Sequence, residues 1–210
     1  MGIFNSYIFG KLRKSVGNVT TYELNGQQVA RGKVVFKHDP KTPAQLEQRA
    51  RMKMVRRLAR EMTPAVREGF PGATLGEKYN HFVQRNIGLL GVDEQGNMGF
   101  DPEQLQLSSG ETAAPDVSAS VDREAGVVVF TQQAQPLRPS MPDDDRVFGA
   151  VLPLDGKDFV KVFPLLLRGE SGTTEIALPE GMKGARLAVY AFTMGANGKK
   201  AGQTVCCLVE

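Results

Sequence analysis

The chain has 210 residues, of which 41% are hydrophobic and 23% are charged, which is typical of a globular protein and not of a disordered or collagen-like one. Two cysteines cannot form a disulfide framework, and no apolar run approaches the ~18 residues of a membrane-spanning helix. The first residues lack the pattern of a secretory signal peptide. We therefore expect a protein that is made in the cytoplasm and has no membrane partner.

Charge is distributed unequally along the chain, although the net value is only +3. Residues 1–90 carry 16 Lys and Arg against 6 Asp and Glu, whereas residues 91–210 carry 10 against 17. Such asymmetry favours a partner of opposite charge for the basic half, either an acidic protein surface or a DNA backbone. It equally favours self-association, because the basic half of one copy would attract the acidic half of its neighbour.

The N-terminal part of the chain carries a strong hairpin signal. Asn25-Gly26 separates two runs that are rich in β-forming residues. Asn-Gly is a preferred pair for a two-residue hairpin turn because both residues tolerate positive φ. We expect a β-hairpin over residues 18–36. The arm before it, residues 1–16, is expected either to dock on another molecule or to pack on this hairpin.

Three helices are predicted after the hairpin. Pro43 directly follows Thr42, which is a typical helix start, and Pro64 must interrupt a helix because it cannot donate to the preceding turn. Thr74 with Glu77 matches a capping box. The predicted helices run from Pro43 to about Met62, from Thr63 to Gly69, and from Thr74 to about Asn86.

The rest of the chain is predicted to be β-rich. Residues 91–116 are rich in glycine and proline, which predicts a linker that either lacks regular structure or contains one short strand. Seven short β-prone runs follow, as in an immunoglobulin-like or fibronectin-III-like β-sandwich. They are 117–121, 126–132, 146–152, 158–167, 173–178, 186–194 and 203–209.

The predicted fold class is therefore α+β, in two parts. A basic domain at 1–90 combines the hairpin with about three helices, and a seven-stranded β-sandwich at 117–210 follows the linker at 91–116.

The first predicted helix carries the one pattern with chemical content. At 100° per residue, five cations fall on one face of the helix, which is about 100° wide. The opposite side is apolar and includes Met52, Met54 and Met62. These methionines either fill the core or adapt to the surface of a partner. The cationic face is either an anion-binding ridge or an ordinary solvated face. Because no aromatic residue lies among the cations and no helix-turn-helix or zinc-finger pattern occurs, we favour a protein partner over nucleic acid. The five partner-binding candidates are Arg49, Lys53, Arg56, Arg57 and Arg60.

No catalytic or cofactor pattern stands out. His38 and His81 have no Cys or carboxylate at metal-ligand spacing, and the run Asp143–Asp145 lacks the alternating spacing of a calcium loop. The chain contains neither a nucleophile elbow nor a phosphate loop. We therefore expect no catalytic residue, no metal and no cofactor, and a protein that is not an enzyme.

Several short motifs are similar to those of one protein family. They are Gly17-Asn18-Val19, the segment from Pro40 to Arg49, Gly69-Phe70 and Tyr79-Asn80. With the β-rich C-terminal half, they resemble a family of bacterial and bacteriophage-associated proteins, and the second motif also resembles stretches of phage structural proteins. The resemblance implies a component of a virion or particle and brings no catalytic residues with it.

Two hypotheses follow. The first is a structural subunit, assembled into a phage virion or related particle through contacts with other protein subunits. The second is a nucleic-acid-binding protein that packages or protects DNA through the basic helix. They differ in salt response, because binding to a nucleic-acid backbone weakens steeply with salt.

Overall fold

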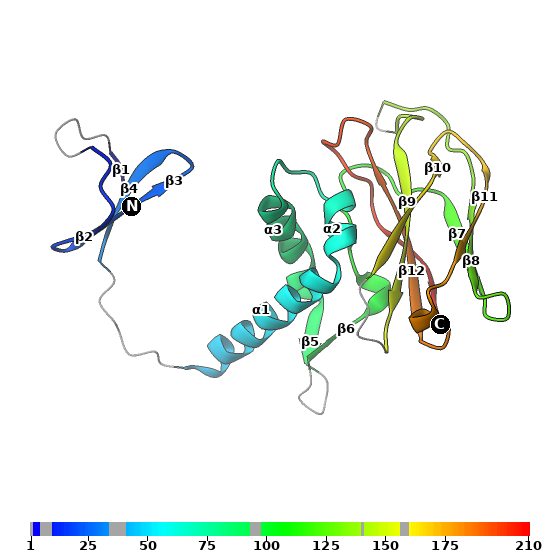
Figure 1. The fold of residues 1–210 in the computed structure, drawn as a ribbon, viewed down its shortest axis with the longest axis horizontal. Helices are drawn as coiled ribbons and strands as arrows, with labels where there is room; N and C mark the ends of the chain where they lie inside the picture. The colour runs from blue at the N-terminus through cyan, green and yellow to red at the C-terminus, as the bar shows by residue number, and fades with distance from the viewer. Residues whose placement is uncertain (1, 5–9, 34–40, 93–97, 140, 156–159) are drawn as a thin grey trace. The chain divides into compact units, whose positions relative to one another are not determined.

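The structure is a computed structural model that describes residues 2–4, 10–33, 41–92, 98–139, 141–155 and 160–210 (Figure 1). It is a mixed α+β protein in which the described residues form three α-helices and several antiparallel sheets. The chain divides into two compact units, Met1–Thr42 and Pro43–Glu210. Each unit is taken by itself below.

The first unit is a small antiparallel sheet built around the predicted hairpin. Asn25 and Gly26 have φ values of 50° and 79°, so both occupy the positive region that a two-residue hairpin turn requires. The hairpin is thus confirmed, with its last predicted residues, 34–36, outside the described residues. The sheet has the order β1-β4-β3-β2, with β1 at Gly2–Ile3, β2 at Lys14–Val16, β3 at Val19–Leu24 and β4 at Gln27–Gly32.

The second unit begins with the three predicted helices, α1 (Pro43–Glu61), α2 (Thr63–Gly69) and α3 (Leu75–Asn86). The capping box before α3 is complete. The backbone N of Glu77 donates to Oγ1 of Thr74 at 3.2 Å, and the backbone N of Thr74 donates to Oε2 of Glu77 at 3.3 Å. The helix starts and the break near Pro64 are confirmed.

All seven predicted C-terminal runs contain a strand, with ends that differ by a few residues; residues 158–159 of the fourth run lie outside the described residues. They make two antiparallel sheets, ordered β10-β9-β12-β13 and β11-β8-β7 among the described residues. The strands are β7 (Val117–Asp122), β8 (Val127–Gln132), β9 (Arg146–Pro153), β10 (Lys161–Leu167), β11 (Gly172–Ala177), β12 (Leu187–Met194) and β13 (Val205–Val209).

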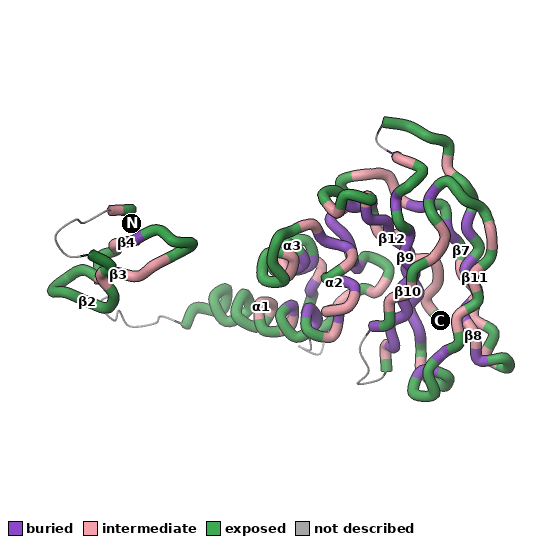
Figure 2. The backbone as a smooth tube through the Cα atoms, turned by 45° about the horizontal axis from the view of Figure 1, so that its top comes forward, coloured by how far each residue is buried: buried purple, intermediate pink, exposed green. Residues whose placement is uncertain are grey.

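The second unit has three layers, with the four-stranded sheet between the helices and the three-stranded sheet (Figure 1). Phe148 and Tyr190 pack on the helical side, whereas Val151 and Val189 pack toward Phe130 of β8. Strands β9 and β12 are therefore buried along almost their whole length, as Figure 2 shows. Their nearly continuous apolar sequences follow from this double coverage.

The boundary between units differs from the predicted domain organisation of 1–90, 91–116 and 117–210. Leu105 and Leu107, in the expected linker, lie in the same core as the three helices and the four-stranded sheet. The backbone N of Ser109 also donates to the carbonyl of Gly69 at 3.0 Å. The helices have one apolar face each and bury it on the sheet, so they belong to the same unit as the strands.

The expected linker also contains more secondary structure than one strand. Strands β5 (Leu90–Val92) and β6 (Met98–Phe100) pair with each other, and a short 3-10 helix follows at Pro102–Gln104. Gly91 and Gly99, which contributed to the linker prediction, lie inside the two strands. Glycine and proline also carry no information on whether the apolar residues of the segment are covered.

Candidate functional site

The five predicted partner-binding cations all lie on the exposed face of α1. Arg49, Lys53, Arg56, Arg57 and Arg60 are exposed. The opposite face of the helix is buried in the core through Val55, Leu58, Ala59 and Met62. The helical periodicity thus separates charge from core as expected, and we call the five residues the cationic face.

The charge of the cationic face is only partly offset. Nε of Arg57 lies 2.9 Å from Oε1 of Glu61, four residues along the helix. The side chain of Arg57 is 81% exposed, and an exposed pair of this kind contributes at most about 0.5 kcal/mol. Among the described residues, no ion pair involves Lys53, Arg56 or Arg60. The face therefore keeps a net positive charge.

Hydrogen bonds to neighbouring elements hold α1 in place. The hydroxyl of Tyr79 on α3 donates to the carbonyl oxygen of Arg56 at 2.7 Å. The backbone N of Val160 donates to the carbonyl of Glu61 at 3.2 Å. Because these bonds use the backbone of α1, the helix is fixed while the charged side chains stay available for a partner.

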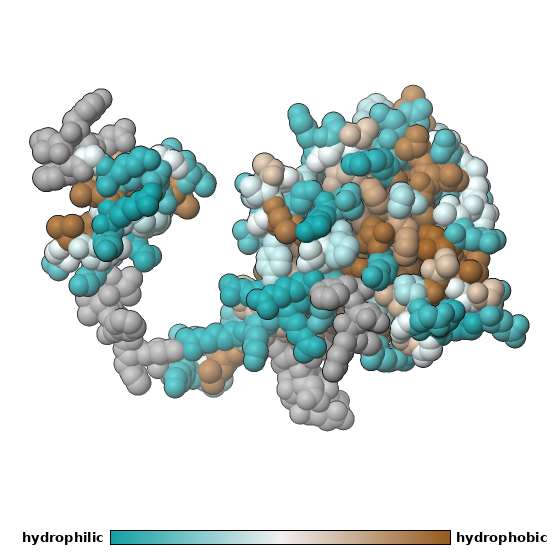
Figure 3. Space-filling model, viewed as in Figure 1, coloured by the Kyte–Doolittle hydropathy of each residue, from teal (hydrophilic) through white to brown (hydrophobic). Residues whose placement is uncertain are grey.

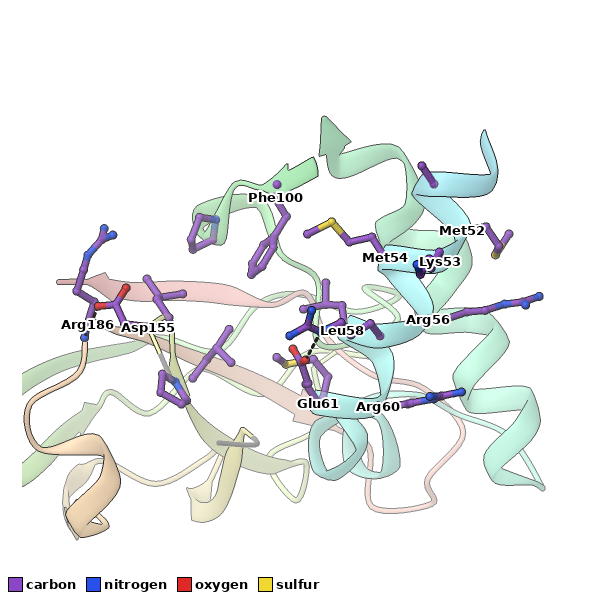
Figure 4. Close-up of a pocket in the computed structure, with 18 of the residues that line it drawn as sticks. Met52, Lys53, Met54, Arg56, Leu58, Arg60, Glu61, Phe100, Asp155 and Arg186 are labelled. Atoms are coloured by element: carbon purple, nitrogen blue, oxygen red, sulfur yellow. Dashed lines mark hydrogen bonds and ion pairs between the residues drawn. The ribbon is translucent and has the colours of Figure 1, made fainter. Parts of the chain in front are cut away.

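A groove of about 1240 Å³ runs along α1. Its far side is formed by β6 and by the residues that end β9 and precede β12 (Figure 4). The lining residues are Arg49, Ala50, Met52, Lys53, Met54, Arg56, Arg57, Leu58, Arg60, Glu61, Met62, Gly99, Phe100, Pro102, Leu152, Pro153, Leu154, Asp155 and Arg186.

The groove combines an apolar floor with a charged rim. Met54 and Phe100 point into the space between α1 and β6, and Asp155 and Arg186 lie across from the helix (Figure 4). Arg56 and Arg60 extend from the other side of α1. The cationic face therefore borders the groove along one edge without filling it.

The far wall of the groove was missed by reasoning from the sequence. Phe100, Leu154 and Arg186 lie far from α1 along the chain, and only the three-layered packing brings them beside it. The methionines on the apolar side of α1 divide in a similar way. Met62 is fully buried in the core, whereas Met52 and Met54 are half-buried and line the groove.

Burial favours the neutral forms of both cysteines and of Tyr190. Burial raises the pKa of the Cys207 thiol to about 12 and also raises that of Cys206. Burial likewise raises the pKa of Tyr190, whose hydroxyl donates to the carbonyl of Pro102 at 2.8 Å. At neutral pH both thiols are therefore protonated, which makes them poor nucleophiles and poor metal ligands.

Comparisons of the chain with protein-family models, with curated proteins and with solved structures each found no match. The likeness to bacteriophage-associated proteins therefore stays a prediction from short motifs. Within the described ranges, no three His, Cys, Asp or Glu side chains are grouped so that they could hold a metal ion. None of the helices in those ranges has the length and apolar character needed to cross a membrane.

Proposed function

We propose that the chain is a non-enzymatic assembly subunit, a component of a bacteriophage virion or a phage-like particle that works by contacting other protein subunits. The observation that carries the proposal is the exposure of apolar side chains on the small N-terminal unit. Figure 3 shows hydrophobic residues at the surface of this unit.

The N-terminal unit buries little apolar surface of its own. Among its described residues, Val29 is the one apolar side chain that is buried. Val16 and Val19, which lie opposite each other in β2 and β3, are 65% and 41% exposed. Ile3 and Leu24 are 66% and 49% exposed. Units of about 40 residues usually need disulfides, metals or oligomerisation for stability, and residues 1–42 contain no cysteine.

The edges of this sheet are poorly suited to strand addition. β1 has two residues and β2 has three, and β2 begins at Lys14. Short edge strands and edge lysines discourage pairing with another chain. We therefore expect the unit to dock through side chains and not by extending its sheet.

The charge of the unit indicates the kind of surface it meets. Residues 1–42 carry 7 Lys and Arg against 2 Asp and Glu, whereas residues 91–210 carry 10 against 17. The unit of one copy would thus be attracted to the acidic part of a neighbouring copy. Contacts of this head-to-tail kind build closed rings or open filaments.

The seven C-terminal strands support a fibronectin-III-like sandwich as part of the proposal. In constant-type immunoglobulin domains the fourth strand lies with the first, second and fifth. Here the fourth strand, β10, instead pairs with β9 and lies in the sheet of the third, sixth and seventh strands. The strand arrangement therefore differs from that of constant-type immunoglobulin domains. Such sandwiches often serve as interaction modules, which fits an assembly protein at the level of fold analogy.

Sedimentation velocity at several protein concentrations tests the proposal. We expect concentration-dependent oligomers of the intact chain, weakened about tenfold by the paired substitution Val16→Ser and Val19→Ser, because apolar contact area is lost. Leu137→Ser removes an apolar side chain that is 69% exposed in the second unit and is the matched control. Equal self-association of the two variants would contradict the role given to the N-terminal unit.

A nucleic-acid-binding protein is the second candidate, favoured by the unbalanced charge of the cationic face. If it is correct, affinity for duplex DNA should fall steeply with salt, and the slope should decrease by about two when Arg56→Gln and Arg60→Gln are combined. A slope that is the same in the variant and the parent chain would remove α1 from any DNA contact.

A further inference from the structure

We infer that the groove beside α1 binds an extended acidic segment of a protein partner, in which apolar side chains alternate with carboxylates. This inference rests on the proposed function, because it gives the chemistry of one partner of the assembly subunit. Three features of the groove support it: the apolar floor, the net positive charge of the rim, and the glycine in strand β6, which leaves space beside the backbone.

The floor of the groove suits apolar side chains. Met54, Phe100 and Leu154 are half-buried, contact the core and line the groove. Methionine is flexible and polarizable, so Met54 can adjust to different apolar side chains. A nucleic-acid backbone would leave this floor uncovered, which favours a polypeptide as the occupant.

The rim of the groove suits carboxylates. Its described lining residues include two carboxylates, Glu61 and Asp155, and six cations, of which two, Arg56 and Arg60, extend from the other side of α1. Arg57 pairs with Glu61, whereas Lys53 has no ion pair among the described residues. Arg186 adds a cation on the far side (Figure 4). An occupant with a net negative charge is therefore favoured along the length of the groove.

The length and backbone of the groove suit an extended chain. The lining part of α1, from Arg49 to Glu61, spans about 18 Å at the helical rise of 1.5 Å per residue, which equals about five or six residues of a strand. Gly99 of β6 also lines the groove and stands opposite Gly91 of β5. A Cβ added at either glycine would meet no atom within 4 Å.

Glycine at an open position in a strand permits another backbone to approach closely. Strand β6 pairs only with β5 among the described residues. The backbone around Gly99 can therefore lie against an added strand, which is a common way to bind peptides. Alternating side chains of such a strand would point in turn toward the apolar floor and toward the charged rim.

The probe for the test is a fluorescein-labelled peptide of alternating leucine and glutamate, added to the full-length protein and followed by fluorescence anisotropy. Three further probes separate the contributions of the apolar side chains, of the negative charge and of the polypeptide backbone. One has serine in place of every leucine, one has lysine in place of every glutamate, and one is a single-stranded DNA of similar charge. We expect saturable binding of the leucine–glutamate peptide and affinities at least about tenfold weaker for the other three.

Two substitutions alter the groove at residues that are not fully buried in the core. Gly99→Val fills the open space beside β6, and Met54→Gln makes the floor polar while keeping its shape. Each should weaken binding of the leucine–glutamate peptide at least about fivefold. The matched controls are Gly184→Val, at another glycine where an added Cβ meets no atom within 4 Å, and Arg67→Gln, at an exposed cation outside the groove lining. Both controls should stay within about twofold of the parent chain.

Three outcomes would overturn the inference. The first is no saturable binding of the leucine–glutamate peptide. The second is equal binding of the serine–glutamate peptide or of the DNA, which would show a general polyanion surface. The third is equal weakening by the groove variants and the controls. Sedimentation of the same preparations distinguishes the assembly proposal from the peptide-binding inference. Oligomers that form although the peptide does not bind would agree with the assembly proposal and would contradict peptide binding in the groove.

Discussion

Arg168 and Asp145 form an ion pair that is almost completely shielded from water. Nε of Arg168 lies 3.2 Å from Oδ2 of Asp145, and the two side chains are 0% and 5% exposed. The guanidinium also donates to Oγ1 of Thr193 at 2.6 Å, to the carbonyl of Ala113 at 3.0 Å and to Oε1 of Gln135 at 2.8 Å. One buried arginine thus connects the segments around Ala113 and Gln135 to Thr193, near the end of β12.

Removing one member of this pair should be far more damaging than removing both. Burial raises the pKa of Asp145 and lowers that of Arg168, so each charge is held at a desolvation cost. We expect Asp145→Ala to lower the free energy of unfolding by about 3–5 kcal/mol, because an unpaired guanidinium remains buried. The free energies of unfolding of the parent chain, Asp145→Ala, Arg168→Met and the double variant, measured in urea, form a double-mutant cycle. Strictly additive losses would contradict the coupling.

Stability should fall in alkaline solution. The pKa of Cys207 is about 12 in the folded chain, against an ordinary value of 9.0, because burial disfavours the thiolate. Between these values the folded state keeps a proton that the unfolded state releases, so the free energy of unfolding falls as pH rises from about 9 toward 12. Burial of Tyr190 acts in the same direction.

Urea midpoints measured at neutral pH and at about pH 10.5 test this dependence. Cys207→Ala should show a smaller fall between the two conditions than the parent chain. A midpoint that rises with pH, or an equal fall in both chains, would show that this thiol does not contribute to the dependence.

The capping box of α3 should contribute measurably to stability. Thr74→Ala removes the acceptor for the backbone N of Glu77, and we expect a loss of about 1 kcal/mol in the free energy of unfolding. Thr74→Ser keeps a hydroxyl at the same position and is the control. If the two variants unfold at the same urea concentration, the cap makes no net contribution.

The close approach of β8 to β9 depends on a glycine. A Cβ at Gly149 would lie 2.7 Å from Cζ of Phe130, inside the contact between the two sheets. Gly149→Ala should therefore destabilise the fold by about 1–3 kcal/mol through overpacking. Gly184→Ala, where the added Cβ meets no atom within 4 Å, should have little effect on the thermal midpoint. Similar losses in both would show that the constraint is not steric.

Local signals explain why most secondary structure could be predicted. The Asn25-Gly26 turn, the break near Pro64 and the cap at Thr74 each depend on residues within one turn of each other. The division into units depends instead on burial between distant segments. Glycine and proline between 91 and 116 predicted a linker, but Leu105 and Leu107 are buried by helices and strands that lie elsewhere in the sequence.

The candidate site shows the same limit. Helical periodicity was sufficient to place the cationic face on the solvent side of α1, because that face is a property of one segment. The groove also needs Phe100 and Arg186, which no local pattern connects with α1. The continuous apolar runs of β9 and β12 were the one available sign that helices cover the second side of their sheet.

The most direct test of the assembly function is the mass of the intact protein in solution. Size-exclusion chromatography with multi-angle light scattering, at low and at high salt and with and without duplex DNA, measures it. The proposal predicts ordered multiples of the 22.8 kDa chain in protein alone, which persist at high salt. A chain that stays monomeric and shifts only with DNA, and only at low salt, would contradict the proposal and favour the nucleic-acid-binding alternative.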